Sequence, residues 1–200
     1  MNDKFFDLKK EKQDRMINAA LKIFGQLGYR FASTDDIVRE AGISKGLLFH
    51  YFGSKLGLYS FIYDYSVRYM SMELKASVNP KETDFFAIYK QMEIGKLQVL
   101  KNYPCMQLFL DKCNEETVSE ALLAIEEKRL EFQQFCNEID AQANLSIFPT
   151  PEDGEKIRYM LKCAIRCTME KHFMEHSFHA EMLYDENIAY IALLKNILLP

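Results

Sequence analysis

The sequence contains little glycine and proline, and both are unevenly distributed. Its 200 residues include eight glycines and five prolines; six of the glycines lie within the first 57 residues, and the first proline is Pro80. So few of these residues indicate few tight turns, and a scarcity of valine and threonine disfavours a sheet. We therefore predict an all-α chain whose first quarter consists of short elements and whose remainder consists of long helices.

Long apolar runs and paired cysteines are also missing. No apolar run approaches the ~18–20 residues that span a bilayer, and no apolar stretch follows the basic start as it would in a secretory signal. The five cysteines form an odd number without a CxxC pair, which argues against a disulfide framework. These absences predict a soluble protein of the cytoplasm with no membrane partner.

Charge is distributed unequally along the chain. Residues 1–60 carry ten lysine or arginine residues against seven aspartate or glutamate residues, whereas the remainder carries 15 against 22. A basic N-terminal part in an acidic protein favours an anionic partner for that part alone. The charge therefore divides the chain into a basic N-terminal part and an acidic remainder.

The N-terminal part has the pattern of a helix-turn-helix. Residues 9–27 predict one amphipathic helix, because its apolar residues recur at steps of three and four. Two short helices follow, the first with Thr34 or Ser33 as its N-cap and the second over residues 45–51. Gly42 lies between them and suits a tight turn. Such a pair is typical of a helix-turn-helix, and the preceding helix completes a three-helix unit.

The outer face of the second short helix separates two interpretations. We expect Leu48 and Phe52 to point inward, and Leu47 and Phe49 to remain exposed. Exposed apolar residues fit a helix in the major groove, where they touch thymine methyl groups and Gly46 permits close approach. The alternative is a surface helix whose apolar residues meet the body of the protein. Donors suited to flanking phosphates surround this helix: Thr34, His50, Tyr51 and Lys55.

A dense motif runs through this part of the chain: Ile17-x-x-Ala20-x-x-x-Phe24-x-x-x-Gly28-Tyr29, then Thr34-x-x-Ile37-x-x-x-Ala41-Gly42-Ile43-Ser44-Lys45-Gly46-x-Leu48-x-His50-Tyr51-Phe52-x-Ser54-Lys55. It resembles the DNA-binding domain of the TetR family of one-component transcriptional regulators. The resemblance implies that bases or adjacent backbone are contacted by Ser44, Lys45, Gly46, Leu47 and Phe49. It also implies that phosphates are held by Thr34, His50, Tyr51 and Lys55. Leu47 and Phe49 each lack the hydroxyl that is usual in the family, which favours apolar contact or shape readout.

The rest of the chain predicts longer helices, over about 55–78, 83–102, 104–113, 114–144, 152–178 and 185–199. The last one is apolar nearly all round, which indicates a second packing partner. One interpretation is a dimer interface, and the other is a helix buried within one chain. The resemblance implies a homodimer through the last two helices, and a two-fold dimer also suits the recognition of two half-sites.

Aromatic and methionine residues of the larger domain are candidates to line a cavity for a small apolar effector. The alternative is that they form ordinary core. The candidate pocket residues are Phe85, Phe86, Tyr89, Met92, Phe109, Phe132, Phe135 and Tyr159.

A Cys/His set suggests sensing of a metal or of thiol redox state. Cys163-x-x-x-Cys167 precedes His172-x-x-x-His176-x-x-His179, and such spacings place neighbouring members on one helix face. The five-residue step between Cys167 and His172 separates the two groups. Buried cysteines and surface histidines are the simpler interpretation. No phosphate loop, dinucleotide motif or nucleophile elbow occurs, so neither enzyme activity nor a cofactor is expected.

Together these features predict two domains, a helix-turn-helix DNA-binding domain over residues 1–54 and a helical ligand-binding and dimerisation domain over residues 55–200. We expect a homodimeric repressor that binds a palindromic operator in double-stranded DNA through residues 35–52 of each chain. A small-molecule effector in the larger domain is expected to release the DNA by changing the arrangement of the two DNA-binding domains of the dimer, the heads of the two chains. The alternatives are a metal- or redox-sensing regulator and a helical protein that binds a protein partner in place of DNA.

Overall fold

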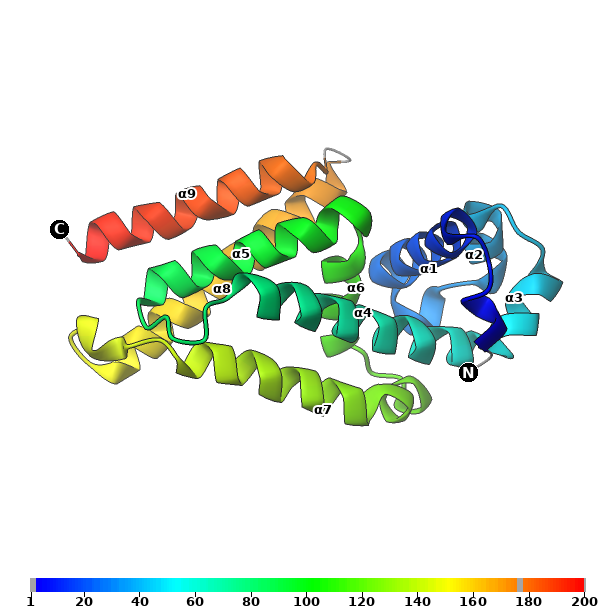
Figure 1. Cartoon of the computed structure of the whole chain (residues 1–200), viewed down its shortest axis with the longest axis horizontal. Coiled ribbons are helices and arrows are strands. Elements are labelled where there is room, and N and C mark those ends of the chain that lie inside the picture. The colour runs from blue at the N-terminus through cyan, green and yellow to red at the C-terminus, as the bar shows by residue number, and fades with distance from the viewer. Residues whose placement is uncertain (1–2, 176–177, 200) are drawn as a thin grey trace. The chain divides into compact units, whose positions relative to one another are not determined.

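The computed structural model describes residues 3–175 and 178–199, which form nine α-helices and two short 3-10 helices (Figure 1). The elements in chain order are η1 (Asp3–Phe5), α1 (Lys10–Phe31), α2 (Thr34–Ala41), α3 (Lys45–Phe52), α4 (Lys55–Ser77), α5 (Phe85–Asn102), α6 (Met106–Asn114), α7 (Ser119–Ala141), η2 (Leu145–Ile147), α8 (Pro151–Met174) and α9 (Ala180–Leu198). No strand occurs among these residues. The predicted all-α fold with about nine helices is therefore confirmed. Within the same residues, every helix is too short or too polar to span a bilayer.

The chain divides into two compact units. The first unit contains Met1–Tyr69 and Tyr103–Phe132, and the second contains Met70–Asn102 and Gln133–Pro200. The continuous helices α4 and α7 each contribute residues to both units. The predicted boundary between residues 54 and 55 separates DNA binding from ligand binding and dimerisation, and it stays a prediction.

The core of the first unit is aromatic. Phe24, Tyr59 and Phe109 are at most 1% exposed. Their rings meet edge-on, with centroids 5.1 Å apart for Phe24 and Tyr59 and 5.7 Å apart for Tyr59 and Phe109. Gly25 lets α1 approach α6 closely, because a Cβ at this position would lie 3.2 Å from the backbone nitrogen of Phe109. The helix that precedes the helix-turn-helix is thus packed directly against α6.

The core of the second unit is also aromatic, and it is built around α5. Phe85 has ring centroids 5.1 Å from Phe86, 5.0 Å from Tyr89 and 5.1 Å from Phe148. α9 packs along α5, and α8 contacts both α9 and η2. Large apolar side chains elsewhere on α8 and α9 remain exposed, among them Met160, Leu193 and Ile197.

Several predicted helix boundaries differ from the structure. α1 continues to Phe31, because the helix resumes beyond a kink at Gly28, whose φ is 69°. The long charged helix begins at Ser119 and not at Asn114, since α6 extends through Asn114 and a short turn follows. α8 ends at Met174 and α9 begins at Ala180, whereas the expected limits were about 178 and 185.

Candidate nucleic-acid interface

The ends of α2 and α3 are set by local capping residues. The Ser33 hydroxyl oxygen accepts the N–H of Asp35 at 3.1 Å, so Ser33 is the N-cap of α2. Gly42 ends α2 with a φ of 62°, a left-handed conformation that costs little only for glycine. The Ser44 hydroxyl oxygen accepts the N–H of Leu47 at 3.2 Å and begins α3. These bonds build the predicted helix-turn-helix from residues close together in sequence.

The side chains of α3 follow the predicted division between inner and outer faces. Leu48 is 1% exposed, while Phe49 is 37% exposed. Phe52, expected to be buried, is half-buried. Among the nine predicted contact residues, five are exposed (Ser44, Lys45, Gly46, Phe49 and His50) and four are half-buried (Thr34, Leu47, Tyr51 and Lys55). The outer face of α3 therefore offers a cation, a glycine and an accessible aromatic ring to a partner.

Lys45 forms an ion pair on this surface. Its ammonium nitrogen lies 2.8 Å from Oδ1 of Asp35, and both side chains are about half exposed or more. Exposed ion pairs contribute ~0–1 kcal/mol, because water and salt screen them. A phosphate oxygen therefore competes with Asp35 for Lys45 at little cost.

Lys55, a predicted phosphate contact, packs against an aromatic ring, whereas Lys45 pairs with an exposed carboxylate. The Nζ of Lys55 is 4.4 Å from the centroid of the Tyr29 ring, in a cation–π contact. The Tyr29 hydroxyl donates to Oε1 of Glu120 at 2.8 Å, and the Tyr29 backbone N–H donates to Oε2 of Glu116 at 2.9 Å. We call these four residues the Tyr29 cluster. Sequence analysis missed it, because 87 and 91 residues separate Tyr29 from its two carboxylate partners.

Burial and charge shift two pKa values within the Tyr29 cluster. Burial, followed by the hydrogen bond to Glu120, raises the pKa of Tyr29 to about 12. Burial lowers the pKa of Lys55, and the carboxylates of Glu120 and Glu116 oppose that shift. Lys55 is thus held beside an aromatic ring and two acceptors at the start of α4.

An N-terminal segment packs against the end of α3. Phe5 is 1% exposed, and its ring centroid lies 5.8 Å from Tyr51, 5.2 Å from Phe52 and 5.1 Å from Phe61. Gln13 fixes the segment, because its side-chain amide donates to two backbone carbonyls there at 2.8 and 3.0 Å. Sequence analysis missed this contact as well. The available signal was a pair of phenylalanines just before the first long helix.

The eight predicted effector-pocket residues are divided between the two units. Phe109 and Phe132 belong to the first unit and the other six belong to the second. Phe85 and Phe86 are fully buried against neighbouring rings, as is Phe109 in its own unit. These residues fill cores, because close-packed aromatic rings leave no room for a ligand. A pocket of about 510 Å³ is lined instead by residues of α7, η2, α8 and the segment joining α7 to η2, and Tyr159 alone of the predicted set lies at it.

The Cys/His set is dispersed. His172 is 6% exposed, and its Nε2 lies 2.9 Å from Oε2 of Glu186. Cys163 is half-buried and Cys167 is exposed, while His176 lies outside the described residues. In the part of the chain that the structure describes, no three His, Cys, Asp or Glu side chains gather where they could hold a metal ion.

Comparison with known proteins matches the N-terminal part of the chain. Residues 16–60 match the model of the bacterial regulatory proteins of the tetR family. The chain is 42% identical over 59 residues to an uncharacterized HTH-type transcriptional regulator, YuxN, of Bacillus subtilis (strain 168), covering 28% of this chain and 20% of that protein. It is 42% identical over 48 residues to the HTH-type transcriptional regulator HbdR of Aromatoleum sp. (strain CIB), covering 24% and 21%. The matched segments thus span about a fifth of the length of these curated relatives.

Solved structures extend the likeness along the chain. A TetR family transcriptional regulator from Chloroflexus aurantiacus J-10-FL superposes with a TM-score of 0.57 at 19% identity, over 98% of this chain and 90% of that one. A TetR-like transcriptional regulator from Rhodococcus sp. RHA1 gives 0.56 at 15% identity, over 96% and 100%. At these identities the likeness shows a shared fold across both units.

Proposed function

Since residues 16–60 match the model of the bacterial regulatory proteins of the tetR family, we propose that this chain is a transcriptional repressor of that family, which binds a palindromic operator as a dimer and leaves it when a small molecule binds. Regulators of this family are not enzymes, in agreement with the sequence-based expectation. The observation that carries the proposal is the capped helix-turn-helix with an exposed outer face on α3. A repressor of chromosomal genes acts in the cytoplasm.

The exposed face of α3 is assigned to the major groove. Phe49 is suited to contact a thymine methyl group, and nothing lies within 4 Å of a Cβ built on Gly46, so backbone can approach a base edge there. The proposed base or nearby backbone contacts are Ser44, Lys45, Gly46, Leu47 and Phe49. The proposed phosphate contacts are Thr34, His50, Tyr51 and Lys55, which fix the position of α3 on the duplex.

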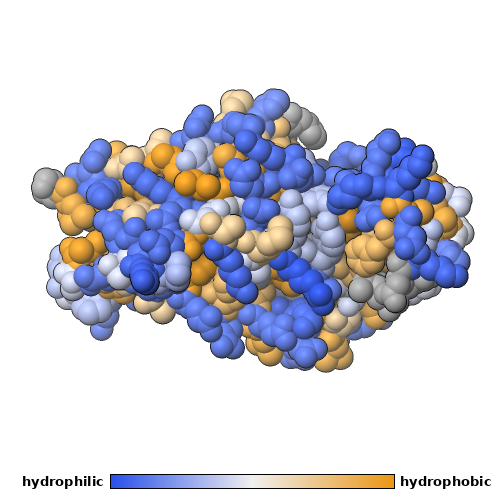
Figure 2. Space-filling view, viewed as in Figure 1, coloured by the Kyte–Doolittle hydropathy of each residue, from blue (hydrophilic) through white to orange (hydrophobic). Residues whose placement is uncertain are grey.

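The uncovered faces of α8 and α9 are assigned to the dimer interface. Leu183, Asn187 and Ile191 bury one face of α9. Large apolar side chains that remain exposed on the two helices include Met160, Met174, Met182, Leu193 and Ile197, at 55–81% exposure. Orange areas interrupt the hydrophilic surface over the region of α5 and α9 in Figure 2. Exposed apolar groups of this extent favour an interface, and a two-fold pairing supplies the second head that an operator requires.

The dimer is tested by placing charge on this surface. Leu193→Lys combined with Ile197→Lys is expected to convert the dimer to monomers in analytical ultracentrifugation, because two buried ammonium groups per chain would lack partners. Leu123→Lys on α7, where the native side chain is 71% exposed, is the matched control and should leave the dimer intact. A dimer that persists in the double variant contradicts this interface.

DNA binding is tested by selecting bound sequences from a random duplex pool at ~0.15 M salt, where weak phosphate binding is screened. We expect a palindrome whose half-sites lie about one turn (~34–36 Å) or a multiple of it apart. Phe49→Ala should then weaken binding to the selected site by ~1–3 kcal/mol. Phe31→Ala is the control, since Phe31 is 73% exposed and is not a proposed contact. A folded dimer that enriches no sequence contradicts the proposal.

A further inference from the structure

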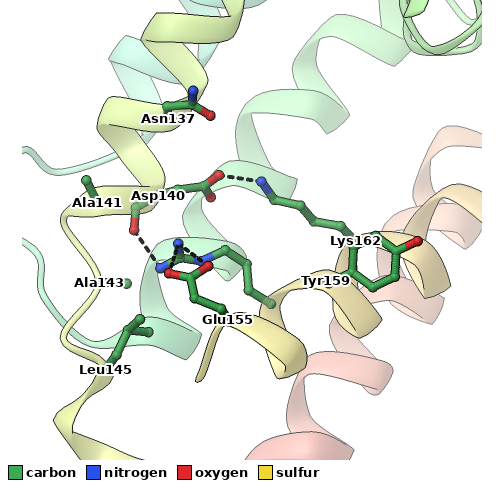
Figure 3. A pocket seen from close by; sticks show the side chains of 9 residues that line it. Asn137, Asp140, Ala141, Ala143, Leu145, Glu155, Tyr159 and Lys162 are labelled. Atoms are coloured by element: carbon green, nitrogen blue, oxygen red, sulfur yellow. Dashed lines mark hydrogen bonds and ion pairs between the residues drawn. The ribbon is translucent and has the colours of Figure 1, made fainter. Parts of the chain in front are cut away.

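A pocket of about 510 Å³ lies in the second unit, where the end of α7, η2 and α8 meet (Figure 3). This volume falls within the range of small-molecule sites, ~300–1,000 Å³. Asp140 projects from the end of α7 toward Lys162 of α8, and Leu145 lies at the far side of the view from Tyr159. The lining combines these side chains with two alanines, Ala141 and Ala143, and with Glu155 and Arg158.

Asp140, one of the two carboxylates that line the pocket, already has an ion-pair partner. Asp140 is 6% exposed. Its carboxylate accepts a hydrogen bond from the Tyr89 hydroxyl at 2.8 Å and forms an ion pair with Lys162. Burial raises the pKa of Tyr89, and this carboxylate adds to the shift. A lysine ammonium has three N–H donors, so the contact with Asp140 leaves donor capacity on Lys162, whose side chain is 45% exposed.

Arg158, the second cation of the pocket, donates hydrogen bonds to partners on both sides. Its side chain is 12% exposed. One terminal nitrogen, Nη2, donates to the backbone carbonyl of Asp140 at 2.9 Å, and Nη1 donates to both oxygens of Glu155 at 2.9 and 3.0 Å. The third nitrogen, Nε, is enclosed and has no hydrogen-bond partner among the described residues. This Nε–H lies on the Nη2 side of the guanidinium, next to the Asp140 carbonyl and away from Nη1, so the groups that a ligand can compete for are those of Nη1.

Glu155 is the replaceable partner of Arg158. Its side chain is 57% exposed, so its carboxylate can turn into water at little cost. Arginine binds carboxylates through two parallel N–H groups more strongly than through one. Glu155 contacts Arg158 through Nη1 alone, so a ligand carboxylate in its place that also lies near Lys162 would meet a second cation.

We propose that this pocket binds a small organic monocarboxylate with a short apolar tail. The ligand carboxylate replaces Glu155 on Nη1 of Arg158 and lies within the field of Lys162. Its tail lies against Leu145 and the two neighbouring alanines, beside the exposed ring of Tyr159. Two cations and two carboxylates line the pocket, so a single negative charge is accommodated when Glu155 turns away, whereas a dianion meets Asp140.

The role of this ligand as effector rests on the proposed function. α7 supplies Asp140 to the pocket and Glu120 to the Tyr29 cluster. One continuous helix therefore carries residues of the pocket and of the cluster that holds Lys55. Ligand binding is measured on the full chain without DNA, so that the pocket and the DNA-binding function are tested separately.

The probes are the straight-chain carboxylates from acetate to octanoate, each compared with the corresponding primary amide. Calorimetry gives the affinity, and the side-chain Nε–H resonance of Arg158 reports the site by NMR. We expect at least one carboxylate to bind and to shift that resonance, while its amide does not. Arg158→Gln should weaken binding about tenfold or more. Arg166→Gln on the same helix is the matched control and should leave the affinity unchanged.

Glu155→Gln should change the affinity for the carboxylate in the direction opposite to Arg158→Gln. Removing the competing carboxylate should tighten binding of the anion about two- to fivefold. The proposal is overturned if no carboxylate binds at up to ~10 mM, if the amides bind equally well, or if Glu155→Gln weakens binding in a folded protein. A carboxylate that binds without releasing the selected operator supports the pocket and overturns its effector role. Absence of operator binding before any ligand is added bears on the proposed function alone.

Discussion

Replacing Lys55 by alanine tests the proposed DNA contact most directly. The substitution removes an ammonium group that lies 4.4 Å from the Tyr29 ring centroid at the start of α4. We expect Lys55→Ala to weaken binding to all duplexes, because a phosphate contact carries no sequence information. We also expect a small loss of stability of about 1 kcal/mol, since the cation–π contact is lost.

The size of the change in salt-dependent DNA affinity follows from counterion release. Each phosphate contact contributes ~0.9 to the slope of log K against log salt, so two heads in a dimer lose a slope of ~1.8. Between ~0.05 and ~0.2 M salt, the native dimer should therefore lose about tenfold more affinity than the variant. Glu120→Gln should act in the opposite direction and raise affinity about twofold, because one negative charge near the phosphates is removed.

Fluorescence anisotropy with the selected operator and with random duplex measures these slopes. Lys75→Ala is the matched control, because it removes the same charge and a similar cation–π contact, at 5.2 Å from Phe135, within the second unit. Its salt slope should equal that of the native protein. An unchanged slope in Lys55→Ala, or an equal change in Lys75→Ala, would refute the assignment of Lys55 to a phosphate.

Three further predictions concern the head. Phe5→Ala should lower the free energy of unfolding by ~3–5 kcal/mol and speed hydrogen exchange in α3. Phe6→Ala, at a side chain that is 48% exposed, should do little; equal effects would contradict a role for Phe5 in holding α3. Gly46→Ala should raise thermal stability slightly, because nothing lies within 4 Å of the added Cβ and alanine favours helix by up to ~1 kcal/mol; operator affinity should nevertheless fall, and an unchanged affinity would exclude close approach of DNA at this position. The pKa of Tyr29 is raised from 10.0 to about 12 in the folded protein, so the unfolded chain loses the phenolic proton at a lower pH than the folded chain does. The stability that the protonated Tyr29 contributes is therefore fully present below pH 10 and is lost as the pH rises toward 12. Denaturant unfolding at several pH values should show a smaller alkaline loss for Tyr29→Phe, and an equal loss would argue against that shift.

The helix-turn-helix was predictable because its determinants are local. Ser33 and Ser44 accept hydrogen bonds from residues two and three positions later. Gly42 is the residue type that leaves a helix with positive φ. Each signal lies within one helical turn of the structure that it specifies, so a pass along the sequence finds it.

The ligand pocket was not predictable from composition. Aromatic and methionine residues indicated an apolar cavity, but Phe85 and Phe109 pack against other rings. The open volume lies where Asp140 and Arg158 meet across two helices. A residue type reports whether a side chain prefers burial, whereas a cavity depends on which neighbouring side chains fail to fill the space.

The sequence by itself determined the helical class, the short capped helices of the head and the outward position of Phe49, since periodicity and capping act between neighbours in the chain. Tertiary structure alone decided that Phe5 supports α3, that Lys55 lies over the ring of Tyr29, which two carboxylates hold, and that the pocket combines charged and apolar side chains. Each of these contacts joins residues from separate helices, and their partners follow from how the helices pack and not from spacing along the chain.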